Sequence, residues 1–143
     1  MDNRKINRLR RWAREGIILV LLTLAVVWGV DQYRKPTLPA SFSATPMTSI
    51  DGNVHDIAAL SQDRPLLIYV WATWCSICRY TTPAVNQLAE EGGNVVSIAM
   101  RSGDNAKLER WVDKKQLKMP VINDANGALS QQWQVSVTPT LAV

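Results

Sequence analysis

The sequence has few of the residues that most often hold metals or build disulfide scaffolds. Among its 143 residues there are two cysteines, three positions apart, and one histidine, His55. Two cysteines exclude a scaffold of several disulfide bonds. With a single histidine they also leave too few soft ligands for an obvious closed zinc site, because such a site takes four. The cysteine pair is therefore the first candidate for chemistry.

Positive charge is missing from most of the chain, although the net charge is +4. Residues 1–15 contain six basic and two acidic residues, whereas residues 36–143 contain eight basic and nine acidic residues. A basic surplus on the folded part is the usual electrostatic mark of a nucleic-acid-binding domain. Because this surplus is absent from 36–143, we expect no binding to nucleic acid.

The N-terminal part contains fifteen residues without a charge, at 16–30. Extended from Trp12 to Tyr33, this run forms a helix of ~33 Å, enough to cross a hydrocarbon core of ~30 Å. Six basic residues before the run, against two after it, orient the N-terminus toward the cytoplasm. We therefore expect four segments along the chain: a cytoplasmic basic tail at 1–15, a transmembrane anchor at 16–33, a linker at 34–46 and a domain on the periplasmic side of the inner membrane at 47–143.

A cleaved signal peptide is the competing interpretation of the apolar run, because its length also suits a signal-peptide core. No clean A-x-A cleavage site follows the run, which favours an uncleaved anchor. A buried helix of a soluble protein is a third interpretation, and the asymmetric flanking charge argues against it. The first two interpretations both export the C-terminal part.

The remainder of the chain alternates between strand and helix patterns. Asp51-Gly52-Asn53 lies between two short apolar runs and predicts a hairpin. The other expected elements are a short helical turn at 58–61, strands at 66–72, 95–100 and 119–122, helices at 80–91, 104–116 and 128–133, and an extended segment at 135–143. This alternation predicts an α/β layered sheet.

The two cysteines form the motif Cys75-Ser76-Ile77-Cys78 between a predicted buried strand and a predicted helix. Haem attachment would need a histidine at position 79, which is arginine. A helix N-terminus lowers the pKa of a thiol placed there. A second thiol one turn later can then resolve a mixed disulfide. We therefore predict Cys75 as the exposed nucleophile and Cys78 as the more buried resolving thiol.

The residues around this motif carry a family resemblance. Residues 71–78, Trp-Ala-Thr-Trp-Cys-Ser-Ile-Cys, resemble the W-A-x-W-C-x-x-C signature of thioredoxins. Pro83 matches the proline that kinks their active-site helix, and Val137-Thr138-Pro139-Thr140 resembles their cis-proline segment. With its anchor and extra helix at 104–116, the chain is similar to the TlpA/ResA-like branch. Within that branch it looks most similar to the suppressor-of-copper-sensitivity protein D group.

The resemblance implies a thioredoxin-like α/β fold, with a central sheet flanked by helices, and a protein-disulfide oxidoreductase without cofactor or metal. Trp74, Thr138 and Pro139 would dock the substrate, and a cis bond before Pro139 would let Thr138 pair with a substrate strand. The implied partners are proteins with thiols or disulfides, and a membrane thiol reductase that supplies electrons. The implied role is that of a reductase or isomerase of dedicated substrates, in tolerance of copper stress.

Two features depart from the thioredoxin pattern. Thioredoxins carry a buried acid six residues before the first cysteine, where this chain has Tyr69. The proton acceptor for Cys78 is therefore left open. The fold normally continues after the cis-proline with a hairpin and a final helix, whereas the sequence ends at Val143. We therefore expect a thioredoxin-like fold that is incomplete at its C-terminus.

An alternative function belongs to another class. A metal-binding, copper-buffering module could use the same cysteine pair, and His55, Met100 and Met119 are the other residues whose chemistry suits copper. Single methionines and histidines in apolar surroundings are more often core or surface residues. A thioredoxin-like adaptor without turnover is a third interpretation, but it would not need both thiols.

Overall fold

The computed structural model describes residues 3–34 and 46–143. The chain divides into two compact units, Met1–Lys35 and Pro36–Val143. Nearly all of the linker expected at 34–46, and the first two residues of the expected basic tail, lie outside the described residues.

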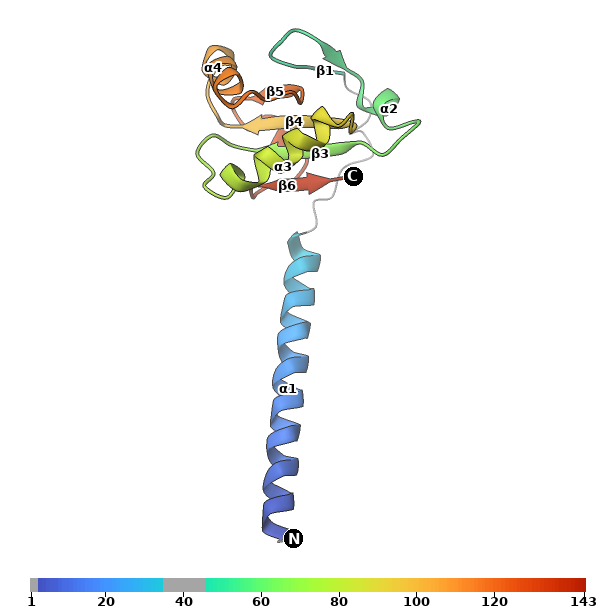
Figure 1. The fold of residues 1–143 in the computed structure, drawn as a ribbon, viewed down its shortest axis with the longest axis vertical. Coiled ribbons are helices and arrows are strands. Elements are labelled where there is room, and N and C mark those ends of the chain that lie inside the picture. The colour runs from blue at the N-terminus through green and yellow to red at the C-terminus, as the bar shows by residue number, and fades with distance from the viewer. Residues whose placement is uncertain (1–2, 35–45) are drawn as a thin grey trace. The chain divides into compact units, whose positions relative to one another are not determined.

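The N-terminal unit is a single helix, α1 (Asn3–Arg34), drawn in blue in Figure 1. Residues 7–33 of this helix are long and apolar enough to cross a membrane, by length and composition. These 27 residues rise ~40 Å along the helix axis. All of the side chains of residues 7–33 are exposed.

The C-terminal unit contains two sheets and four helices among its described residues. The first, small sheet pairs β1 (Met47–Thr48) with β2 (Val54–His55) in antiparallel register. The remaining elements are α2 (Ile57–Leu60), β3 (Leu67–Trp71), α3 (Cys78–Glu90), β4 (Val95–Met100), α4 (Asn105–Lys115), β5 (Val121–Asp124), α5 (Ala128–Gln132) and β6 (Thr140–Ala142).

The central sheet has the strand order β5-β4-β3-β6. The pairs β3–β4 and β4–β5 are parallel, and β6 runs antiparallel to β3. Parallel strands need crossover connections, and α3 and α4 provide them. Because the carboxyl ends of the parallel strands share one edge, the segments that follow β3 and β4 meet there (Figure 1).

The alternation of side chains along β3 separates two hydrophobic clusters. Ile68 and Val70 point to one side of the sheet and pack in the cluster that includes Ile98 and Trp133, which we call the α5 face. Tyr69 and Trp71 point to the other side, and their cluster, which we call the α3 face, includes residues of α3 and α4: Cys78, Val85, Leu108, Trp111 and Val112.

The helix ends follow the sequence signals. Asp104 is the N-cap of α4, and its carboxylate accepts a hydrogen bond from the Lys107 N–H at 2.8 Å. Gly92 follows the C-cap of α3 with φ +85°, a conformation that favours glycine. A Cβ atom at Gly93 would lie 2.6 Å from the carbonyl oxygen of Leu88, so only glycine fits this close approach.

The predicted α/β architecture and the order of its elements are confirmed, and two strands differ most from their expected bounds. The strand expected at 119–122 begins only at Val121, because Pro120 has no backbone N–H to donate to a sheet ladder. The extended segment expected at 135–143 is a strand only over Thr140–Ala142, after the bond that precedes Pro139.

Candidate active site

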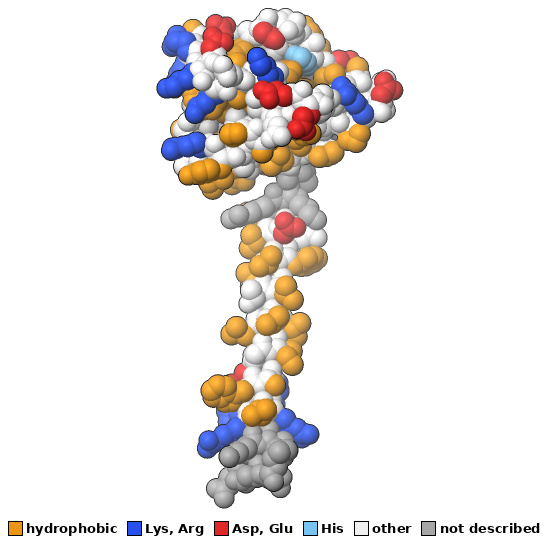
Figure 2. All heavy atoms as spheres, in the orientation of Figure 1, with side chains coloured by type: hydrophobic (Ala, Val, Ile, Leu, Met, Phe, Trp, Pro, Cys, Tyr) orange, Lys and Arg blue, Asp and Glu red, His pale blue; other side chains and the backbone are white. Residues whose placement is uncertain are grey.

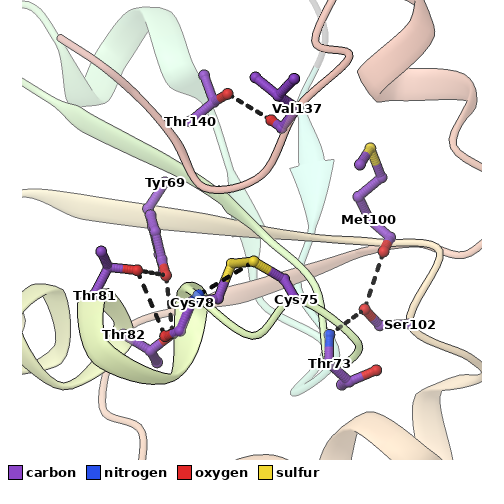
Figure 3. The surroundings of a disulfide bond; sticks show 10 residues. All are labelled: Tyr69, Thr73, Cys75, Cys78, Thr81, Thr82, Met100, Ser102, Val137 and Thr140. Atoms are coloured by element: carbon purple, nitrogen blue, oxygen red, sulfur yellow. Dashed lines mark hydrogen bonds between the residues drawn. A yellow bond between two sulfur atoms is a disulfide. The ribbon is translucent and has the colours of Figure 1, made fainter.

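The cysteine pair lies at the edge of the sheet where β3 ends. Trp71 is the last residue of β3, and α3 begins at Cys78, so Cys75 lies in the connecting loop just before the helix. The two cysteines form a disulfide with a Cα–Cα distance of 5.3 Å, which is within the normal range for such bonds. The sequence motif is therefore a formed disulfide at a strand-to-helix junction (Figure 3).

The two sulfur atoms have different surroundings. Cys78 is 2% exposed, whereas Cys75 is half-buried. The backbone N–H of Cys78 donates a hydrogen bond to the Sγ of Cys75 at 3.2 Å. This N–H belongs to the first turn of α3, where the helix dipole also stabilises negative charge. The Sγ of Cys75 therefore has a backbone hydrogen-bond donor in a partly exposed residue, whereas Cys78 is enclosed by protein.

Tyr69 takes the place where a buried acid was expected from the resemblance, and it points toward the first turns of α3. Its side chain is fully buried, and its hydroxyl forms hydrogen bonds with the hydroxyls of Thr81 at 2.8 Å and Thr82 at 2.9 Å (Figure 3). The part of β3 beneath α3 therefore carries a cluster of hydroxyl groups that are hydrogen-bonded to one another.

Thr81 and Thr82 were not singled out by the sequence. Their spacing is the signal that could have found them, because residues three and four positions after Cys78 lie on the same helix face as that cysteine. The partner of this pair could not be read from the sequence, since Tyr69 lies on a different element.

Hydrogen bonds hold the loop before Cys75 against the residues at the end of β4. The hydroxyl of Ser102 accepts a hydrogen bond from the Thr73 N–H at 2.9 Å and donates to the carbonyl of Met100 at 3.0 Å (Figure 3). The indole N–H of Trp74 donates to the carbonyl of Arg101 at 3.1 Å, although the Trp74 side chain is 61% exposed. Trp74 is therefore held at the surface beside Cys75.

The segment around Pro139 lies at the same edge of the sheet. Thr140 pairs with Val70, one residue before the end of β3, so the preceding residues continue toward the disulfide loop. Figure 3 shows the turn between Val137 and Thr140 on one side of the cysteine pair. The Thr138–Pro139 peptide bond is cis, as expected, and both residues are half-buried.

The three candidate copper ligands do not form a site. Met100 packs on the α5 face and Met119 on the α3 face, so the central sheet separates them. His55 lies on β2, where its Nε2 is 2.9 Å from the hydroxyl of Ser49. Among residues 3–34 and 46–143, no group of three or more His, Cys, Asp or Glu side chains could hold a metal ion.

The AhpC/TSA family model matches residues 38–143, which is well over half of the chain. The chain belongs to the AhpC/TSA family. A thioredoxin-like protein of Haemophilus influenzae is 35% identical to it over 136 residues, covering 95% of this chain and 81% of the relative. The thiol:disulfide interchange protein DsbE of Pseudomonas aeruginosa is 30% identical over 140 residues, covering 88% and 76%.

A solved structure resembles the fold of this chain. The secreted disulfide oxidoreductase of Mycobacterium tuberculosis, described as homologous to E. coli DsbE, has a TM-score of 0.58 and 28% identity, covering 68% of this chain and 72% of that one. The protein is therefore a thiol–disulfide oxidoreductase with a thioredoxin-like fold, related to DsbE and ResA.

Proposed function

We propose that the protein is a membrane-anchored reductase or isomerase of protein disulfides, with Cys75 as nucleophile and Cys78 as resolving thiol. In the reduced protein, the Cys75 thiolate attacks one sulfur of a substrate disulfide, and the other substrate sulfur leaves as a thiolate that takes up a proton. The Cys78 thiol then loses its proton and attacks the Sγ of Cys75, which re-forms the intramolecular disulfide. Two electrons pass to the substrate, whose second sulfur also leaves as a thiol.

The observation that carries this division of roles is the contrast between the two sulfur atoms. The half-buried Cys75 accepts the N–H at the start of α3, whereas Cys78 is 2% exposed. The substrate sulfur can therefore reach Cys75, and Cys78 is in place for the second, intramolecular attack.

Single serine variants test the assignment. With Cys75→Ser we expect no exchange with a protein disulfide, because the reachable thiolate is lost. With Cys78→Ser we expect a stable mixed disulfide through Cys75, detectable by non-reducing electrophoresis and mass spectrometry. Equal alkylation rates of Cys75 and Cys78 in the reduced wild-type protein would contradict the division of roles.

Trap formation can also test the docking residues. We propose that Trp74, Thr138 and Pro139 border the substrate, supported by the exposure of Trp74 and by the position of the turn before Thr140. In the Cys78→Ser background, Trp74→Ala should slow the formation of mixed disulfide with a protein substrate. An unchanged rate would remove Trp74 from the docking surface.

The membrane arrangement is part of the proposal. The proposed segments are a cytoplasmic tail at 1–15, an anchor at 16–33, a linker at 34–46 and a periplasmic catalytic domain at 47–143. The length and apolar composition of α1 and the flanking positive charge support it. Protease added outside intact spheroplasts should digest the catalytic domain and spare the tail, and carbonate extraction should leave the anchor in the membrane. Protection of the whole chain would contradict this topology.

The direction of electron flow follows from this location. A dithiol in an oxidising compartment stays reduced only if it receives electrons, so we propose a membrane thiol reductase as donor. Trapping of thiols in cells should find a reduced fraction of the cysteine pair that disappears when the donor is removed. A fully oxidised pair with a potential near ~−120 mV would instead assign the protein to the oxidants.

The resemblance to the suppressor-of-copper-sensitivity protein D group supports a narrower proposal, in which the dedicated substrates serve copper tolerance. Cells that lack the gene should grow more slowly under copper stress, and the wild-type gene should restore growth, whereas Cys75→Ser should not. Equal copper sensitivity with and without the gene would contradict this role and would leave the exchange activity in place.

A further inference from the structure

A groove with a volume of about 850 Å³ runs along α3, and residues 72–76 of the disulfide loop line it. Its opposite wall is the C-terminal end of α4. The lining residues of α3 and its C-cap, Glu91, form two neighbouring rows at helical spacing: Cys78, Thr82, Asn86 and Glu90, and Arg79, Pro83, Gln87 and Glu91. The groove therefore starts at the cysteine pair and follows α3 to its end.

The length of the groove suits a polypeptide. The 13 residues of α3 rise ~20 Å along the helix axis. An extended chain advances ~3.3 Å per residue, so about six residues of a bound segment can lie beside α3. Because one end is at the cysteine pair, such a segment can be continuous with the residue whose sulfur reacts at Cys75.

The walls of the groove are held in place without a ligand. The buried side chain of Asn86 on α3 accepts a hydrogen bond from the Lys118 N–H at 2.6 Å and donates to the carbonyl of Gln116 at 3.4 Å, which fixes the end of α4 against α3. Trp111, which lines the groove, stacks on the buried Trp71 with ring centroids 4.7 Å apart. A preformed groove loses little ordering entropy on binding.

The charge of the groove is positive in a domain that has no basic surplus. Three cationic and two anionic side chains line it. Glu90 and Glu91 each accept a hydrogen bond from an amide side chain of α3, at 3.1 and 2.9 Å, and Lys115 lies 5.7 Å from the Trp111 ring centroid.

Arg79 and Lys114 complete the five charged groups. Neither forms an ion pair within residues 46–143, the described part of this unit. Both are exposed, so their charges are available to a ligand. Figure 2 shows Lys and Arg side chains gathered on the side of the domain where Figure 1 places α4.

We infer that this groove binds the segment that flanks the reactive cysteine of the substrate protein, and that it favours segments with acidic side chains. A carboxylate of the segment meets Arg79 or Lys114, and an apolar side chain covers Trp111. The inference rests on the proposed function and gives its substrates a chemical class, namely proteins with acidic residues next to the reactive cysteine.

Two synthetic peptides test this inference. Each contains one intramolecular disulfide, and they differ only in that three glutamates beside the first cysteine of one peptide are glutamines in the other. The reduced full-length protein in detergent is mixed with each peptide, quenched with acid at set times, and separated by chromatography. At low salt we expect the glutamate peptide to react roughly threefold to tenfold faster, a ratio that one or two partly exposed ion pairs can supply.

Salt and two matched variants locate the effect. The ratio of the two rates should fall toward one at ~1 M salt, where the screening length is ~3 Å. Lys114→Gln should lower the ratio at low salt. Lys107→Gln changes the same charge on the same helix outside the groove lining, and it should retain the ratio.

Each other outcome has a defined meaning. Equal rates for the two peptides with wild-type protein would overturn this inference and leave the exchange activity standing. A ratio that survives Arg79→Gln combined with Lys114→Gln would also overturn it, since the acidic preference would then come from another surface. Failure to reduce either peptide would overturn the proposed function, and the groove inference with it.

Discussion

The two faces of the central sheet differ in chemistry although the same strands build both. On the α5 face the buried cluster contains only apolar residues and Trp133, including Ile68, Val70 and Ile98. On the α3 face the cluster contains Tyr69, Trp71 and Cys78, and a polar groove runs along its helices. Neighbouring residues of β3 therefore serve different purposes.

The difference indicates how a small domain can carry a reactive pair without weakening its core. Ile68 and Val70 contribute burial of apolar surface, the dominant favourable term in folding. Tyr69 and Trp71 contact the elements that hold Cys78 and line the groove. Substitutions on the α5 face should therefore change stability more than exchange chemistry, and this separation can be tested.

The largest effect is expected on the α5 face. Ile98 is 1% exposed, so Ile98→Ala should lower the free energy of unfolding by about 2–5 kcal/mol. Urea denaturation measures the loss, and Ile98→Val is the matched control at about 0.5–1.5 kcal/mol. A large fall in the rate of thiol–disulfide exchange by the molecules that remain folded would contradict the idea that the α5 face serves stability and the α3 face serves chemistry.

A smaller effect is expected where the groove wall is held. Asn86→Ala leaves the Lys118 N–H without its side-chain partner, so we expect a loss of about 1–3 kcal/mol. Unlike Ile98→Ala, this variant should also reduce the preference for acidic peptides, because the end of α4 is no longer fixed. A loss of stability with an unchanged ratio of the two peptide reduction rates would show that the Asn86 hydrogen bonds do not shape the groove.

The hydroxyl cluster beneath α3 should contribute less. Tyr69→Phe removes the partner of Thr82, which is 4% exposed, and should cost about 1 kcal/mol of folding stability. Tyr80→Phe is the matched control, because Tyr80 is 80% exposed, and we expect a change within about 0.5 kcal/mol. Equal losses in thermal or urea denaturation would contradict a specific role for the buried hydroxyl.

The smallest effect is expected on the β1–β2 hairpin. Hydrogen bonds from the Ser49 hydroxyl, above all, and from the Asn53 N–H lower the pKa of Asp51 below 3.8. The unfolded chain therefore binds more protons at low pH. The contribution of Asp51 to folding stability is complete above its pKa in the unfolded chain, and it disappears as the pH falls through its pKa in the folded protein.

Solvent screening limits this contribution to below about 0.5 kcal/mol, because the carboxylate is exposed. Urea denaturation at pH 6 and pH 2.5 measures it, and Asp51→Asn should show the smaller pH dependence of the two proteins. An identical dependence in both would show that the Asp51 hydrogen bonds add nothing to stability.

The sequence was a good guide to features with local causes. The N-cap at Asp104, the glycine that ends α3, and the placement of Cys75 before a helix follow from patterns a few residues long. The cis bond before Pro139 was expected from the family resemblance.

Contacts between distant segments could not be read from the sequence. The stacking of Trp111 on Trp71 joins residues 40 positions apart along the chain, and no local pattern selects one partner for a tryptophan. The hydrogen bond from the Lys118 N–H to the Asn86 side chain joins residues 32 positions apart, and hydrophobic periodicity gives no sign of such a polar contact. The hydrogen bond from the Ser97 hydroxyl to the carbonyl of Pro120 joins residues 23 positions apart and is another such contact.

The hydrogen bond from the Thr73 N–H to the hydroxyl of Ser102 allows this one backbone amide to report on opening of the active-site loop. The Thr73 N–H donates to this side chain and not to a backbone carbonyl of the sheet, so it is protected from hydrogen exchange only while the loop stays against β4. Amides inside β3 and β4 exchange through larger openings of the sheet. The difference between their exchange rates and that of Thr73 therefore measures, in a single experiment, how often the loop that carries Cys75 opens while the domain remains folded.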